Sequence, residues 1–177
     1  MQWLNEPAEF SDAGGRITIR AKPQTDFWRV THDGGVRDSG HFYYRTVSGN
    51  FSATVRFSAG YRDLYDQAGI MLRVDEARWV KCGVEFTNGQ QNASAVVTRD
   101  FSDWSILPLA GSPPAFWLRV VRDGATVEVH YSLDGATYTL IRQAYFTDRP
   151  AVDVGLMVCS PIGGGLTAVF EDFAITP

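Results

Sequence analysis

The chain has 177 residues, of which 45% are hydrophobic and 20% are charged, and its formal net charge is −4. These values are typical of a globular protein, and the mild acidity argues against nucleic-acid binding, which usually requires a basic face. No apolar run approaches the roughly 18–20 residues that a membrane-spanning helix needs, and the first residues lack the features of a signal peptide. We therefore expect one domain over residues 1–177, cytoplasmic, with neither nucleic acid nor membrane as a partner.

Alternating apolar and polar residues predict strands along most of the chain, whereas no segment has the periodicity of a helix. The predicted strands are residues 16–20, 41–47, 51–57, 68–74, 78–86, 93–99, 115–122, 125–132, 137–144, 151–159 and 166–175. Asp-Gly pairs at 123–124 and 134–135 stand between alternating runs and indicate tight hairpins. This pattern predicts an all-β fold, with two antiparallel sheets stacked as a sandwich.

The predicted strands 68–74 and 78–86 carry unusual residues on the face opposite their apolar one. If they are neighbours, one shared face presents Gln67, Arg73, Trp79, Lys81 and Glu85. An exposed indole between a cation and an anion suits ligand binding, because the ring stacks on flat apolar faces while the charges bond polar edges. The small residues Gly69 and Gly83 on this face favour a groove. The alternative is a cross-strand aromatic beside a solvated Lys–Glu pair.

Two further stretches place an Asp shortly before a Trp, and we expect both in loops. These are Asp26 with Trp28, and Asp103 with Trp104. A carboxylate beside an indole face suits carbohydrate, since sugars have apolar C–H faces and hydroxyl edges. The alternative is an Asp that caps its own turn beside a Trp that anchors the loop to the core.

Several motifs in a fixed order resemble one protein family. Tyr-Asp-Gln-Ala-Gly at 65–69, Trp-Val-Lys at 79–81 and Ser-Asp-Trp-Ser at 102–105 resemble the DUF1349, or regulation-of-enolase, family of the concanavalin A-like lectin/glucanase superfamily. The resemblance covers the chain from Trp3 to its end. It implies a jelly-roll sandwich whose concave face and rim loops could bind a ligand. The resemblance also adds five residues to the candidates for ligand binding, namely Asp26, Trp28, Asp66, Asp103 and Trp104.

Three functions follow as hypotheses. The first is a binding module for a carbohydrate or another polar small molecule, with some negative charge on the ligand favoured by Lys81 and Arg73. The second is a regulatory protein–protein interaction module acting on a metabolic enzyme, which requires a flat aromatic patch; the candidates for it are Tyr43, Tyr44 and Tyr61. The third is a glycoside hydrolase or lyase that uses Glu85 with a loop carboxylate, Asp66 or Asp103.

Neither a metal nor a cofactor is expected. The three histidines are scattered, the two cysteines are 77 positions apart, and Cys82 is predicted to face the core. For the candidate site we expect Lys81 to pair with Glu85 or Asp66, because an isolated charge in a cleft is costly, and to keep Glu85 ionised. If the ten candidate residues form a site, at least five of them line one cavity.

Overall fold

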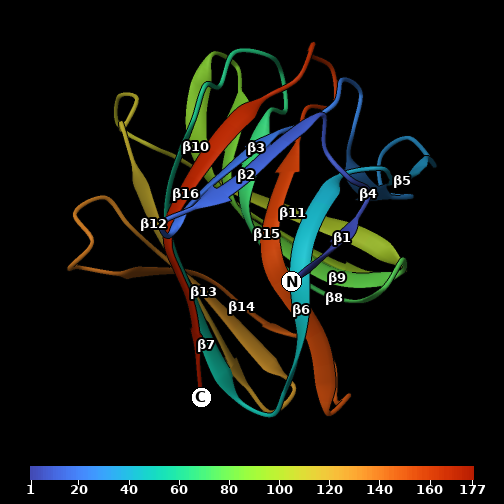
Figure 1. Ribbon diagram of the computed structural model, residues 1–177. Helices are drawn as coiled ribbons and strands as arrows, with labels where there is room; N and C mark the ends of the chain where they lie inside the picture. Colours follow the sequence, from blue (N-terminus) through green and yellow to red (C-terminus); the bar gives the residue numbers. More distant parts are fainter.

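The computed structural model describes all 177 residues as strands, turns and loops (Figure 1). It contains no helix that is long and apolar enough to cross a membrane. The first sheet has the order β1-β6-β15-β8-β9-β10-β11. Its strands are β1 (Gln2–Leu4), β6 (His41–Ser48), β8 (Gln67–Asp75), β9 (Arg78–Thr87), β10 (Gln90–Arg99), β11 (Phe101–Pro108) and β15 (Ala151–Cys159).

The second sheet has the order β14-β13-β12-β7-β16-β3-β2, and β4 and β5 form a separate hairpin. The strands of the second sheet are β2 (Glu9–Ala13), β3 (Arg16–Arg20), β7 (Phe51–Ala59), β12 (Phe116–Asp123), β13 (Thr126–Ser132), β14 (Thr139–Tyr145) and β16 (Thr167–Thr176). The hairpin consists of β4 (Phe27–Arg29) and β5 (Val36–Asp38), drawn in blue at the right of Figure 1. All strand pairs are antiparallel, so the predicted sandwich of two antiparallel sheets is confirmed.

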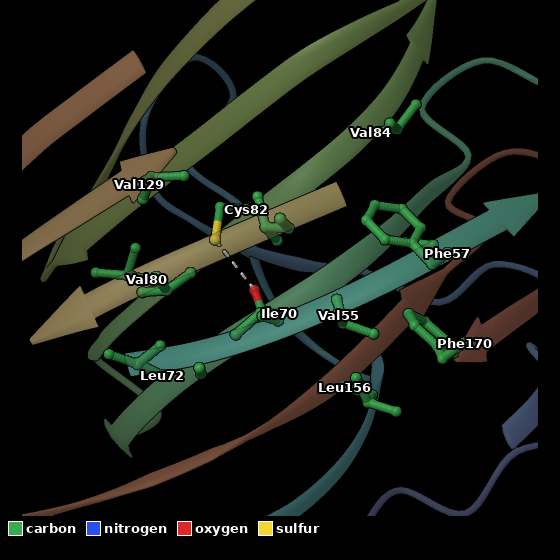
Figure 2. Packing of buried hydrophobic residues seen from close by; sticks show 14 of the residues in the cluster. Val55, Phe57, Ile70, Leu72, Val80, Cys82, Val84, Val129, Leu156 and Phe170 are labelled. Atoms are coloured by element: carbon green, nitrogen blue, oxygen red, sulfur yellow. Dashed lines mark hydrogen bonds between the residues drawn. The ribbon is translucent and has the colours of Figure 1, made fainter. Parts of the chain in front are cut away.

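The main core lies between the two sheets and contains 30 buried residues. Ile70 and Leu72 from β8 and Val80 and Val84 from β9 face it together with Phe57 of β7 (Figure 2). Cys82 also faces this core, as predicted, and its thiol donates to the carbonyl of Ile70 (3.5 Å). The alternation seen in the sequence therefore gives the correct inner face of both strands.

A second, smaller core covers the outer face of the first sheet, the face that points away from the second sheet. It consists of Phe27, Phe42, Met71, Trp79, Val96, Met157 and Cys159. Phe27 belongs to β4, and its ring lies 6.2 Å from that of Trp79. The β4–β5 hairpin thus packs on this outer face, and β8, β9 and β10 are buried on both sides.

All eleven predicted strands are present, with bounds that differ by a few residues. The prediction missed β1, β2, β4, β5 and β11. Most of these are short or lie at a sheet edge, where alternation extends over too few residues to be recognised. The correction that matters for function concerns β4 and β11, because Trp28, Asp103 and Trp104 lie on strands, whereas the prediction placed them in loops.

Candidate functional site

A cavity of about 990 Å³ opens beside the β4–β5 hairpin on the outer face of the first sheet. We call it the β9 pocket. Its floor comes from Gln67 of β8 and from Lys81 and Glu85 of β9, and one wall from Ser102, Asp103 and Trp104 of β11. The remaining lining residues are Gln24, Asp26, Trp28, Thr31, His32, Asp33, Arg37, Ser39, Tyr65, Pro161 and Ile162.

The register between β8 and β9 explains the shape of the floor. Gly69 pairs with Gly83, Met71 with Lys81, and Gln67 with Glu85. Because the central pair has no side chains, room is left between Lys81 and Glu85 on the same face of β9. Asp26 comes close to this space from the β4 side, since its Oδ1 accepts hydrogen bonds from both Lys81 and Gln67.

Lys81 is the buried cation of the pocket, with 3% of its surface exposed. Its Nζ donates to Asp26 Oδ1 (3.1 Å) and to the carbonyl of Phe27 (2.6 Å). Burial lowers the pKa of Lys81, but the charge of Asp26, followed by smaller contributions from Cys159, Glu85 and the hydrogen bond to Asp26, outweighs it and leaves the pKa raised. The predicted pairing with Glu85 or Asp66 is therefore wrong, because Asp26 reaches the ammonium from the hairpin.

Glu85 is also buried, and its two oxygens differ. Oε2 accepts hydrogen bonds from Ser94 Oγ (2.7 Å) and Trp104 Nε1 (2.8 Å). Oε1 has no hydrogen-bond partner within the protein, although the residue is only 6% exposed and lines the pocket. Burial raises the pKa of Glu85, and Lys81 and the two hydrogen bonds reverse only part of that shift. Lys81 thus favours the ionised carboxyl, as expected, but its effect on the pKa is smaller than that of burial.

Gln67 completes the polar floor. Its Nε2 donates to the carbonyl of Tyr65 (3.1 Å) and to Asp26 Oδ1 (3.4 Å). Both partners are acceptors, which fixes the orientation of the amide, because a flipped amide would place its oxygen against two other oxygens. The amide oxygen of Gln67 is therefore a further acceptor without a partner in the protein.

Aromatic rings form the exposed wall of the pocket. Trp104 is 42% exposed, and its ring meets that of Tyr65 edge to face at 6.2 Å. Trp28 is half-buried, and its Nε1 donates to the carbonyl of Thr31 (2.6 Å). Such rings offer flat apolar surfaces beside the polar floor.

The backbone around the pocket is strained at four non-glycine residues. Gln24, Val30, His32 and Tyr65 have φ angles of 56°, 63°, 80° and 66°. This left-handed region is costly for a β-branched residue such as Val30, and such strain gathers at functional sites. The Val30 amide donates to the carbonyl of Gly35 (2.7 Å), which holds the tip of the hairpin in this conformation.

Three of the ten candidate residues lie outside the pocket. Trp79 is 1% exposed and packs in the second core, so the expected exposed indole at this position is wrong. Asp66 is fully buried and accepts hydrogen bonds from Ser160 Oγ and from the amides of Arg62 and Asp63. It therefore holds a turn and cannot supply the second carboxylate of a hydrolase. Arg73 forms a two-bond ion pair with Asp38 (2.7 and 2.8 Å).

The structure brings the other seven candidates together in the pocket: Asp26, Trp28, Gln67, Lys81, Glu85, Asp103 and Trp104. Their role in binding stays a prediction. Residues in the range 31–39, among them the ion pair of Arg37 with Asp33, also line the pocket and were not predicted from the sequence. One available signal was the presence of Met71, Trp79 and Val96 on a face expected to be polar, since so many apolar residues there require a covering segment.

Comparisons with known proteins agree with this architecture. Residues 3–177 match the family model described as "Protein of unknown function (DUF1349)". The chain is 40% identical to "Regulation of enolase protein 1" of Saccharomyces cerevisiae, over 98% of this chain and 88% of the relative. It also resembles the crystal structure of a functionally unknown protein from Saccharomyces cerevisiae, with a TM-score of 0.95 and 39% identity, covering 99% of this chain and 95% of the other.

A more distant structural match is the carbohydrate binding module CBM66 from Bacillus subtilis. The TM-score is 0.62 and the identity 12%, over 99% of this chain and 95% of the module. At this identity the match bears on the fold alone, and it supports the predicted concanavalin A-like jelly roll. The family model covers nearly the whole chain, and the chain therefore belongs to the DUF1349 family.

Proposed function

We propose that the β9 pocket binds a carbohydrate or a related polyhydroxylated small molecule. The observation that carries the proposal is the unused hydrogen-bonding capacity of its buried floor. Glu85 Oε1 and the Gln67 amide oxygen have no partner in the protein, and the Lys81 ammonium uses two of its three N–H donors. Since all three residues line the pocket, a ligand that both donates and accepts hydrogen bonds fits this floor.

The wall and the size of the pocket support the same class of ligand. Trp104 and Tyr65 present ring surface beside the polar floor, and a sugar ring has apolar C–H faces and polar edges. A volume of about 990 Å³ accommodates a small oligosaccharide. The name of the CBM66 module adds an analogy of fold, and the proposal depends on the residues of this chain.

The experiment is calorimetric titration of the protein with a panel of mono- and oligosaccharides, repeated with Trp104→Ala. We expect saturable binding of at least one saccharide, weakened about fivefold or more when the indole is removed. Tyr145→Ala is the matched control, because Tyr145 is 53% exposed on β14 and does not line the pocket. Absence of binding across the panel by the folded protein would contradict the proposal.

A regulatory contact with a metabolic enzyme is the second candidate, favoured by the name of the 40% identical relative. The rim of the pocket offers exposed apolar side chains for such a contact, namely Tyr65, Trp104 and Ile162. Tyr43, Tyr44 and Tyr61, the earlier candidates, are all half-buried. Titration of the chain with purified enolase tests this candidate, and Ile162→Asp, at a residue that is 63% exposed, should weaken any complex formed by the rim.

A further inference from the structure

The two cations that line the β9 pocket are both paired with carboxylates of the protein. Lys81 donates to Asp26, Arg37 pairs with Asp33 at the hairpin, and Arg73 outside the pocket pairs with Asp38. A ligand carboxylate or phosphate would meet no unpaired cation among the lining residues, and the N–H groups left to it are the third of Lys81 and those that Arg37 does not use for Asp33. The negatively charged ligand predicted from Lys81 and Arg73 in the sequence is therefore not favoured by these contacts.

The carboxyl groups of the pocket, by contrast, exceed its cations. Asp26, Asp33, Glu85 and Asp103 line it together with only two cations, Lys81 and Arg37. At the floor, the ammonium of Lys81 is the positive charge that interacts with both Asp26 and Glu85. Two carboxyl groups near a single buried cation leave a deficit of positive charge, which is costly in a poorly solvated site.

The uncommitted atoms lie where a ligand cation could correct this deficit. Glu85 Oε1 has no hydrogen-bond partner, and neither does Asp26 Oδ2, since the bonds to Asp26 from Lys81, Gln67 and the Phe27 amide all end on Oδ1. Glu85 is more than nine-tenths buried and lines the cavity, so a ligand in the pocket can reach its free oxygen.

We propose that the pocket prefers saccharides that carry a protonated amino group to neutral and acidic ones, an inference that rests on the proposed function. The ammonium donates to Glu85 Oε1 or Asp26 Oδ2, and neighbouring hydroxyl groups bond the Lys81 ammonium and the Gln67 amide oxygen. Charge-assisted hydrogen bonds of this kind are roughly twice as strong as neutral ones, which makes the amino group the main source of selectivity.

The test is a titration followed by amide and indole shifts in NMR spectra, which detect weak binding. The ligands are glucose, galactose and mannose, each with its 2-amino derivative and its uronic acid, so that every comparison holds the stereochemistry of the ring constant. Lysine amide serves as a probe with ammonium groups but no hydroxyl groups. We expect at least one amino sugar to bind about tenfold more tightly than its neutral parent, and the uronic acid to bind most weakly.

Glu85→Gln keeps the shape of the side chain and removes its charge, and it should reduce the amino-sugar preference to about twofold while neutral binding persists. Glu128→Gln, at an ion pair on the second sheet, is the matched control. Equal or tighter binding of neutral or acidic sugars by the unaltered protein overturns this inference and leaves the proposed function standing. Lysine amide binding as tightly as the amino sugars overturns the saccharide part. If no sugar of any charge binds, the proposed function fails as well.

Discussion

The ammonium of Lys81 lies 3.1 Å from the carboxylate of Asp26, which is 55 residues earlier in the chain. The same ammonium donates to the backbone carbonyl of Phe27, so it binds the β4–β5 segment to the first sheet at two points. Beside this bond the ring of Phe27 packs against Trp79. A polar bond and an apolar contact together hold the hairpin over one end of β9 and leave the other end, at Glu85, as the pocket floor.

The Lys81–Asp26 bond should matter for stability because both side chains are largely buried. Lys81→Met removes the cation and leaves Asp26 near Glu85 without a neighbouring positive charge. We therefore expect a loss of about 3 kcal/mol in the free energy of unfolding in urea. Arg37→Met, which breaks the exposed pair with Asp33, should cost no more than about 1 kcal/mol. Adding Asp26→Asn to Lys81→Met should restore part of the loss, and no restoration would contradict the role given to Asp26.

Asp66 has a structural role, whereas Asp103 lines the pocket, so substitutions at the two positions should differ in their effect on stability. Asp66→Asn disturbs a carboxylate that accepts two backbone amides and the Ser160 hydroxyl, and should cost about 1–3 kcal/mol in unfolding experiments. Asp103→Asn, at an exposed position, should change stability by less than about 0.5 kcal/mol. The opposite order of the two costs would show that Asp66 does not hold its turn.

His41 should make the protein sensitive to mild acid. The ring is 1% exposed, its Nε2 accepts from the Lys22 amide (2.9 Å), and Nδ1 faces the carbonyl of Asn5 (2.7 Å), which requires the neutral ring. Burial lowers the pKa of His41, whereas in the unfolded chain it is about 6.5. Its stabilising contribution is therefore present above pH 6.5 and is lost as the pH falls through the lower pKa of the folded state.

The measurement is the free energy of unfolding at pH 7.5 and at pH 5.0 for the unaltered protein and for His41→Gln. We expect the difference between the two proteins to shrink at the lower pH. Using the difference removes the contribution of Glu85, which has the opposite sign, because its raised pKa stabilises the folded state as the pH falls. His130→Gln is the control, and a difference that grows with acidity for His41→Gln would contradict the assignment.

The paired glycines of β8 and β9 should be intolerant of any side chain. A Cβ at Gly69 would lie 1.9 Å from the carbonyl oxygen of Cys82, and one at Gly83 would lie 2.1 Å from that of Ala68. Since both obstacles are backbone atoms of the first sheet, we expect Gly69→Ala to lower the free energy of unfolding, measured with heat or urea, by about 2 kcal/mol or more. Gly60→Ala meets nothing within 4 Å and should be close to neutral.

The strands of the sandwich were predictable because alternation is a local property with a fixed period. Ile70 and Leu72 on β8, and Val80 and Val84 on β9, reveal the inner face without any knowledge of their neighbours. The register between β8 and β9 followed from the short connection between them. This was sufficient to place Gln67, Lys81 and Glu85 on one surface.

The position of the β4–β5 hairpin over that surface was not predictable from the alternation of apolar and polar residues. β4 and β5 have three residues each, too few for alternation to identify them, and their position on the first sheet depends on contacts more than 50 residues away in sequence. For this reason Trp79 was interpreted as an exposed ligand platform, although it is part of a second core. The partner of Lys81 was missed for the same reason, because Asp26 arrives with the hairpin.

The assignment of the β9 pocket as the functional site is tested most directly by the response of the five indole N–H signals to a bound saccharide in a ¹H–¹⁵N spectrum. Trp28 and Trp104 line the β9 pocket, whereas Trp3, Trp79 and Trp117 do not. Ligand binding at this site predicts progressive shifts of the Trp104 and Trp28 signals, assigned by single Trp→Phe variants, with the signals of Trp79 and Trp117 unchanged. Saturable binding that moves Trp3 or Trp117 and leaves Trp104 in place would contradict the assignment of the β9 pocket as the functional site.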